Sequence, residues 1–191
     1  GARVLPIDAG AQELESLDAF AERAAREAGA LALVQVFAPA RGGAFLETSW
    51  RQVERACRAQ LLAPFELARA LALRMARAGG GDVVHVVPVA AVEAASGASE
   101  SAVIGGGLAA LTRALARELR AQRIRVNLVV ARTEADDLGL ELTPERAGWA
   151  AAPATVAADD VAEAVAYLLD TRSAALLGAT LHVTGGEPTA R

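Results

Sequence analysis

Short apolar runs alternate along this chain with longer segments in which apolar residues recur every three or four positions. Runs of four to eight apolar residues bounded by glycine or polar residues are typical of buried strands. The runs of this kind are Val4–Ile7, Leu31–Phe37, Val83–Val87, Arg125–Val130 and Thr180–Val183. We therefore expect five strands, each separated from the next by helical sequence.

The segments with helical periodicity carry start and stop residues that set their bounds. Pro64 should kink or interrupt the second helix, because proline lacks a backbone N–H and its ring clashes with the preceding turn. In order, the expected helices are Leu14–Ala28, a segment capped by Thr48 or Ser49 that reaches Arg58 and resumes up to Arg77, Ser99 to about Gln122, one starting at Thr143-Pro144-Glu145, and Asp159 or Asp160 to about Leu169. Strands that alternate with helices imply a parallel sheet covered on both faces.

Length and composition narrow the class of protein. The chain has 191 residues, 53% hydrophobic and 22% charged, with no long polar linker, so we expect a single domain over residues 1–191. Arginine or glutamate interrupts every apolar stretch before membrane-spanning length, and no signal peptide opens the chain, so no membrane partner is expected. The net charge of −4 and the lack of a basic cluster with aromatics argue against nucleic acid. The single cysteine, Cys57, fits a reducing cytoplasm.

One residue type is missing altogether. All 19 lysine-plus-arginine positions hold arginine, so the chain contains no lysine. Its single tyrosine, Tyr167, is followed four residues later by Thr171. Any chemistry that needs a tyrosine and a lysine one helical turn apart is therefore excluded for this chain.

Several strings, in this order, resemble the short-chain dehydrogenase/reductase superfamily between about Leu31 and Gly186. The resemblance implies a Rossmann-like parallel sheet with helices on both faces, and in active members a nicotinamide cofactor. The strings are Leu111-Thr112-Arg113-Ala114-Leu115-Ala116-Arg117-Glu118-Leu119, Arg123-Ile124-Arg125-Val126-Asn127, Asp160-Val161-Ala162 with Tyr167-Leu168-Leu169, Leu177-Gly178, and Val183-Thr184-Gly185-Gly186.

The catalytic positions of that superfamily are all changed here. Aligned through Leu111-Thr112-Arg113, the tyrosine position falls on Ser101 and the lysine position on Gly105. The serine that orients the substrate carbonyl falls on Pro88, which has neither hydroxyl nor N–H. The asparagine of the preceding helix would fall near Cys57 or Gln60. We therefore expect no catalytic residue.

The cofactor-binding positions are changed as well. The sequence starts at about the third strand of the family pattern, without the opening strand–turn–helix that binds the dinucleotide. Val36-Phe37-Ala38-Pro39 replaces an Asn-Asn-Ala-Gly motif, and Ala131-Arg132 replaces a Pro-Gly pair. No cofactor and no cofactor-binding residue are therefore expected. No His/Cys/Asp cluster has metal-ligand spacing, so no metal is expected either.

The remaining residues of interest have structural interpretations. His85 and His182 are expected in the core, Cys57 as a small buried hydrophobe, and Glu93 and Glu100 as loop or cap residues. The tryptophans suit packing or an interface. Gly105-Gly106-Gly107 would let another backbone approach closely, at a subunit interface that includes Ala102, Gly106 and Ala110.

These observations favour a non-catalytic subunit, or pseudoenzyme, in a hetero-oligomeric short-chain dehydrogenase. Its partner would be a catalytic, NAD-dependent paralogue in a dimer or tetramer, acting on a hydroxyacyl-CoA-type substrate such as one of anaerobic toluene and benzylsuccinate degradation. Phe37-Ala38-Pro39 and Pro64-Phe65 also resemble halohydrin dehalogenases, which have an arginine at the lysine position, but Gly105 excludes that option. One alternative is a lyase, isomerase or dehalogenase that needs no nicotinamide, with a pocket near Pro88, Ser96, Ser99 and Ser101. Another is a ligand-binding sensor.

Overall fold

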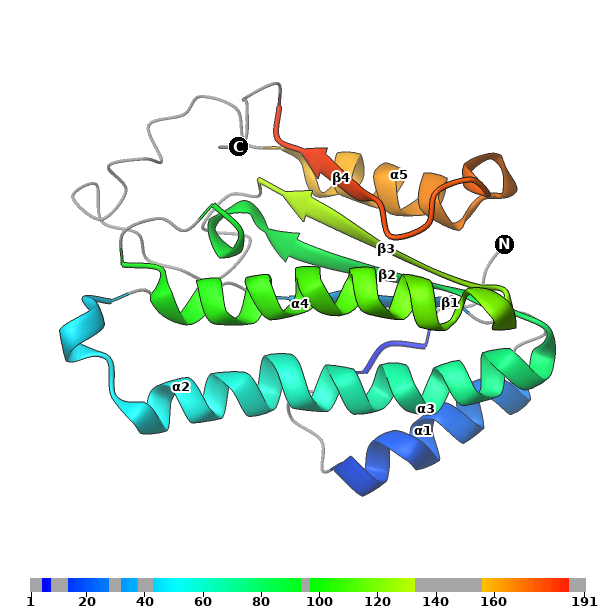
Figure 1. Ribbon diagram of the computed structural model, residues 1–191, viewed down its shortest axis with the longest axis horizontal. Coiled ribbons are helices and arrows are strands. Elements are labelled where there is room, and N and C mark those ends of the chain that lie inside the picture. Colours follow the sequence, from blue (N-terminus) through cyan, green and yellow to red (C-terminus); the bar gives the residue numbers. More distant parts are fainter. Residues whose placement is uncertain are drawn as a thin grey trace.

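A four-stranded parallel sheet with the order β1-β2-β3-β4 forms the centre of the fold (Figure 1). The computed structural model describes residues 5–7, 14–27, 32–37, 43–93, 97–132 and 156–185. The strands are β1 (Ala32–Val36), β2 (Gly81–Pro88), β3 (Ile124–Ala131) and β4 (Thr180–Val183). Each is joined to the next by at least one helix, as parallel pairing requires.

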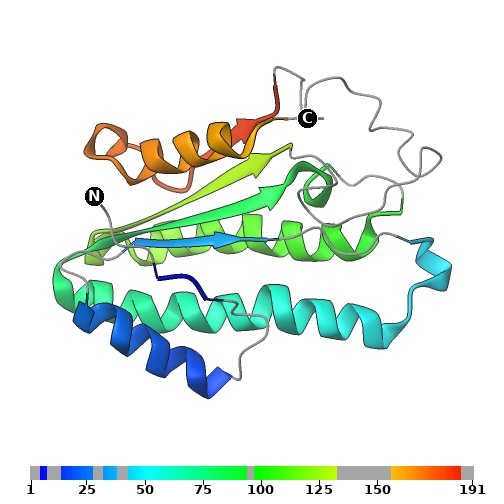
Figure 2. The same ribbon diagram turned by 180° about the vertical axis from the view of Figure 1, so that it is seen from behind.

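Helices cover both faces of this sheet (Figures 1 and 2). One layer contains α1 (Leu14–Glu27), α2 (Trp50–Cys57), α3 (Ala63–Ala78) and α4 (Ser99–Glu118), and α5 (Ala158–Leu169) lies on the opposite face. The predicted Rossmann-like α/β architecture is thus confirmed. No helix in the described ranges is both long and apolar enough to cross a membrane.

The path from α2 to α3 continues through Pro64 without a break in direction. A π-helical turn, Arg58–Leu62, joins the two helices, and Pro64 occupies the first turn of α3. A wider turn accommodates the missing N–H of proline. The side-chain amide of Gln35, on β1, donates a hydrogen bond to the Pro64 carbonyl at 2.9 Å, which links this irregular segment to the sheet.

The bounds of most elements agree with the sequence-based expectations. Ser49 caps α2 by accepting a hydrogen bond from the N–H of Gln52 at 3.3 Å. Gly79 ends α3 with a φ of +95°, the left-handed conformation that glycine adopts without strain. The long helix α4 ends at Glu118, and the chain continues as a 3₁₀ turn, Arg120–Gln122, rather than as α-helix to Gln122.

Some expectations are wrong or lie outside the described residues. Residues 5–7 belong to no strand, although Val4–Ile7 was expected to form one. Leu5 and Ile7 instead pack against the hydrophobic cluster that contains Leu17 of α1 and Leu67 of α3. In the described part of the chain no strand pairs with residues 5–7. Ala98, not Ser99, holds the cap position of α4 and makes no side-chain cap bond. The expected helix at Thr143-Pro144-Glu145 lies outside the described ranges.

Candidate functional site

The position expected for the superfamily's lysine is closed by the chain's own backbone. Gly105 lies buried in α4, directly beneath the 3₁₀ turn Val89–Ala91 that follows β2. A Cβ atom at Gly105 would stand 2.5 Å from the Cβ of Ala91 and still closer to the Ala91 carbonyl oxygen. Real Cβ atoms do not approach backbone this closely, so a side chain at position 105 would require the turn to move.

The two neighbouring positions are also buried. Pro88 is the last residue of β2 and pairs with Ala131 across the sheet. Ser101 is 4% exposed on the first turns of α4, and Ser99 is half-buried. Ser96 lies outside the described residues. The structure therefore brings Pro88, Ser101 and Gly105 to one end of the sheet, as the alignment implied.

His85 is a core residue, as expected, and not a general base for either serine. The Thr112 hydroxyl donates to the Leu108 carbonyl at 2.8 Å, so it accepts from His85 Nδ1, also at 2.8 Å. The imidazole is fully buried and meets Phe37 edge to face. Burial lowers the pKa of His85 to about 4, so the ring is neutral near pH 7. Its Nε2 has no hydrogen-bond partner in the described structure.

Glu93 and Glu100, the two acids expected at loop or cap positions, are partly or fully buried in polar contacts. Glu100 is 7% exposed and accepts from the Gln52 side chain at 2.7 Å. Glu93 lies 3.8 Å from the guanidinium of Arg132, which is itself 8% exposed at the end of β3. The prediction of loop or cap positions is confirmed, since Glu93 lies in the turn after Val89–Ala91 and Glu100 in the first turn of α4, but both also face residues from other elements. Arg132 therefore contributes a buried cation where a Pro-Gly pair was the family pattern.

The other residues that the sequence analysis named agree only in part with their expected surroundings. His182 is exposed, contrary to expectation, because it points outward from β4 at the edge of the sheet. Cys57 is half-buried rather than buried, and Gln60 is half-buried on the π-helical turn. Trp50 is 76% exposed, which leaves an interface as its remaining interpretation, and Trp149 lies outside the described residues. No group of three potential metal ligands occurs within the described ranges.

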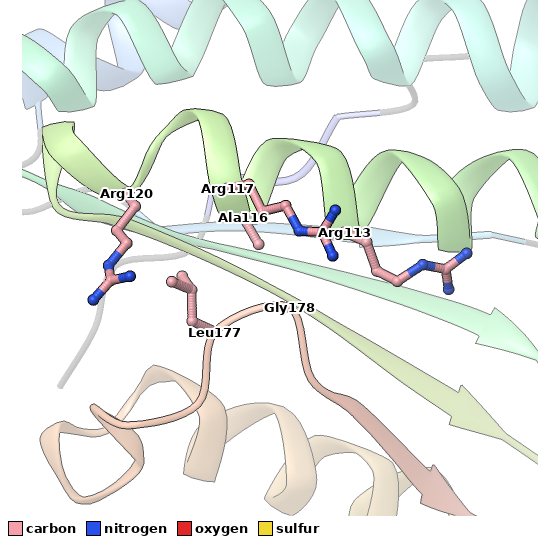
Figure 3. Close-up of a pocket in the computed structure, with 6 residues that line it drawn as sticks. All are labelled: Arg113, Ala116, Arg117, Arg120, Leu177 and Gly178. Carbon is pink, nitrogen blue, oxygen red and sulfur yellow. The ribbon is translucent and has the colours of Figure 1, made fainter.

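A pocket of about 280 Å³ lies at the far end of α4, where sequence reasoning placed no site (Figure 3). Its lining residues come from α4, the following 3₁₀ turn and the turn before β4, namely Arg113, Ala116, Arg117, Arg120, Leu177 and Gly178. Arg113 and Arg117, at positions i and i+4, lie on one face of α4, and Arg120 follows on the 3₁₀ turn after that helix. That spacing was the signal that could have revealed this cluster.

Comparison with known sequences decides the family. A sequence model of the family described as enoyl-(acyl carrier protein) reductase matches residues 1–187. The chain belongs to the short-chain dehydrogenase/reductase superfamily.

Relatives in this superfamily include reductases and one dehydrogenase subunit. The 3-oxoacyl-[acyl-carrier-protein] reductase of Vibrio cholerae is 30% identical over 126 residues, which are 64% of this chain and 52% of the reductase. A (2S)-[(R)-hydroxy(phenyl)methyl]succinyl-CoA dehydrogenase subunit of Thauera aromatica, BbsC, is 36% identical over 132 residues, 66% of this chain and 51% of that subunit. The chain spans about half the length of these curated relatives.

Solved structures of the superfamily share the fold. A 7α-hydroxysteroid dehydrogenase complexed with NADH superposes with a TM-score of 0.83 at 23% identity, covering 96% of this chain and 73% of that one. Acetoin dehydrogenase of Salmonella typhimurium superposes with a TM-score of 0.76 at 24% identity, covering 92% and 71%. These similarities concern the fold alone.

The described residues do not fit the nicotinamide cofactor of active superfamily members. The lysine position is Gly105, and the Ala91 backbone occupies the space into which a side chain there would extend. The Glu93–Arg132 pair lies at the carboxyl ends of β2 and β3, the edge at which open α/β sheets bind ligands. We derive no reaction step through such a cofactor in this chain.

Proposed function

We propose that this chain is a non-catalytic subunit of a hetero-oligomeric short-chain dehydrogenase. The observation that carries the proposal is the contact between Gly105 and Ala91, because backbone fills the lysine position and leaves no room for a replacement side chain. Residues 1–191 would form one domain in the cytoplasm, with no catalytic, cofactor-binding or metal-binding residue of its own. Its partner would be a catalytic, NAD-dependent paralogue.

The similarity to BbsC supports a multi-subunit setting. That relative's name describes it as a subunit of a dehydrogenase acting on a hydroxyacyl-CoA. We propose a hydroxyacyl-CoA-type substrate for the partner on this basis, with the benzylsuccinate branch of anaerobic toluene degradation as the specific candidate. No described side chain of this chain indicates that particular substrate.

Co-expression with a full-length reductase from the same gene cluster tests the proposal. We expect native mass spectrometry to show a mixed dimer or tetramer, with NAD-dependent turnover in the complex and none in this chain alone. Separate species would contradict the proposal. Turnover by the purified chain that is lost in Ser99→Ala or Ser101→Ala would establish the cofactor-independent enzyme instead.

A second measurement examines the closed site directly. The double variant Ser101→Tyr/Gly105→Lys places tyrosine and lysine at the two aligned positions of the superfamily. We still expect no oxidation of NADH, because the turn at Ala91 occupies the space next to position 105. The single variant Ser101→Tyr is the matched control for folding. Reductase activity in the double variant would show that the site was merely missing two side chains, and would remove the main support for a non-catalytic role.

A further inference from the structure

The pocket at the end of α4 differs from the rest of the surface in its charge. We call its six lining residues the arginine basin: Arg113, Ala116, Arg117, Arg120, Leu177 and Gly178. Three of the residues that line this hollow of about 280 Å³ are arginines, and none of them is an acid. Figure 3 shows the three side chains spread along the helix, with Arg117 above Gly178, Arg113 directed away from the turn, and Arg120 at the other end of the pocket.

These arginines have no acidic partner in the described structure, in a chain whose net charge is −4. Other arginines do form ion pairs with acids, namely Arg26–Glu22, Arg58–Glu54, Arg69–Glu66, Arg74–Asp18, Arg125–Asp82, Arg132–Glu93 and Arg172–Asp170. Like charges at i and i+4, such as Arg113 and Arg117, destabilise a helix by roughly 0.2–0.5 kcal/mol. A bound anion would convert this repulsion into attraction.

The wall opposite the helix is held in place before any ligand arrives. Asn127 on β3 donates to the Leu176 carbonyl at 3.2 Å and accepts from the Ala179 N–H at 3.0 Å. The Gly178 N–H donates to the Val126 carbonyl at 2.8 Å. A Cβ at Gly178 would lie 3.2 Å from the Cβ of Ala116, so the turn packs closely on the helix. A fixed wall lowers the entropic cost of binding.

The helix dipole explains only part of this arrangement. Cations in the last turn of a helix interact favourably with its negative end, which suits Arg117 in α4. Arg113 stands one turn earlier, where that effect has fallen off. The dipole also gives no reason for three arginines to gather around a concave surface.

We propose that the arginine basin binds a phosphorylated small molecule. Guanidinium groups match phosphate oxygens with paired N–H donors, and three of them suit a group with more than one negative charge. The hollow is large enough for a diphosphate or a phosphorylated ribose, and Ala116 and Leu177 offer apolar contact to the attached carbon atoms. This inference does not depend on whether the chain is a non-catalytic subunit.

Isothermal titration calorimetry on the purified chain tests the basin with pyrophosphate, coenzyme A and citrate as probes. We expect saturable, one-to-one binding of pyrophosphate or coenzyme A, weakening with added salt. Arg113→Gln and Arg117→Gln should each weaken binding about tenfold, since each removes a charge-assisted hydrogen bond. Tighter binding of coenzyme A than of pyrophosphate would identify a nucleotide carrier as the source of the phosphate, and the reverse a free diphosphate.

Arg51→Gln is the matched control, because Arg51 is an exposed arginine on α2 without an ion pair in the described structure. The Arg51→Gln variant should bind the probes with the same affinity as the wild type. Circular dichroism and a ligand-induced rise in the melting temperature separate loss of binding from loss of folding. The proposal is overturned by no saturable binding, by equal weakening in the control, or by citrate binding as tightly as pyrophosphate.

Discussion

Two adjacent glycines in α4 have opposite surroundings. Gly105 presses against the backbone of Ala91, whereas a Cβ at Gly106 would meet no atom within 4 Å. Both residues are helical, so both lose the same helix propensity relative to alanine. Their difference isolates the packing contribution at Gly105.

Gly105→Ala should destabilise the chain although alanine is the better helix former. Forcing a methyl group into the contact with Ala91 should lower the free energy of unfolding by about 1–3 kcal/mol or more. Gly106→Ala should instead raise it by about 0.5–1 kcal/mol. Urea denaturation of the two variants measures both changes. Stabilisation by both substitutions would show that position 105 has room for a side chain.

His85 makes stability depend on pH. Its pKa of about 4 in the folded chain lies below the ordinary 6.5, so the unfolded chain binds more protons between these values. The free energy of unfolding should therefore rise with pH through this window and fall as the pH drops from 6.5 toward 4, by about 3 kcal/mol in total. Urea denaturation at several pH values measures this slope.

The variant His85→Leu should lose that part of the pH dependence and keep the part due to carboxylates. His182→Asn, on the exposed face of β4, is the control and should leave the slope of the wild type unchanged. An unaltered slope in His85→Leu would mean that the imidazole is protonated in the folded chain.

At the level of elements, β3 positions the turn before β4 through Asn127. The two hydrogen bonds of the Asn127 side chain pair with the Leu176 carbonyl and the Ala179 N–H, and neither of these backbone groups takes part in the strand pairing of the sheet. Asn127→Ala should lower the free energy of unfolding by about 1–3 kcal/mol, because both groups lose a partner. Thr180→Ala, exposed at the start of β4, should change it by no more than about 0.5 kcal/mol. Equal effects would contradict the role of Asn127.

The sequence predicted those elements that local signals define. Periodicity and glycine stops placed β1 to β4 and α1 to α5 within a few residues. The irregularity expected at Pro64 is a π-helical turn, Arg58–Leu62, just before it, a form that the sequence did not predict. Residues 5–7 form no strand, because pairing depends on a neighbour distant in sequence. The exposure of His182 has a similar cause, since β4 lies at the edge of the sheet.

The residue types at the candidate site could be read from the sequence, but the geometry of the site could not. Residue types at Ser101, Gly105 and Pro88 could be read directly, because alignment needs no coordinates. The contact of Ala91 with Gly105 and the Glu93–Arg132 pair each join separate elements, so tertiary packing alone defines them. The arginine basin had a local signal in its spacing, but the wall at Gly178 comes from the far end of the chain.

At the scale of the whole molecule, the sheet is unevenly covered. On the face that carries α5, the side chains of Val84 and Val86 are buried, whereas their register partners Val34 and Val36 on β1 are 40% and 73% exposed. In the described part of the chain β1 pairs with β2 alone, so its other edge offers free backbone groups. Exposed edges of this kind favour pairing with other chains.

Val36→Lys should therefore reduce self-association of the isolated chain without lowering its melting temperature. A charge on an edge strand opposes strand pairing between chains. Val103→Lys, at a valine 53% exposed on α4, is the matched control and should affect association less. Light scattering across a concentration series measures the difference. Equal effects would assign the association to general surface hydrophobicity.

The contact between Gly105 and Ala91 also restricts how a lysine could be introduced at position 105 of this chain. A single substitution that brought lysine back at position 105 would arrive in a space already occupied, and the resulting protein would be less stable before it regained any chemistry. A lysine at position 105 would fit only after the turn at Val89–Ala91 had changed, and a change of that turn alone would add no catalytic residue. An attempt to build a reductase on this scaffold should therefore redesign the turn at Val89–Ala91 before any catalytic residue is added.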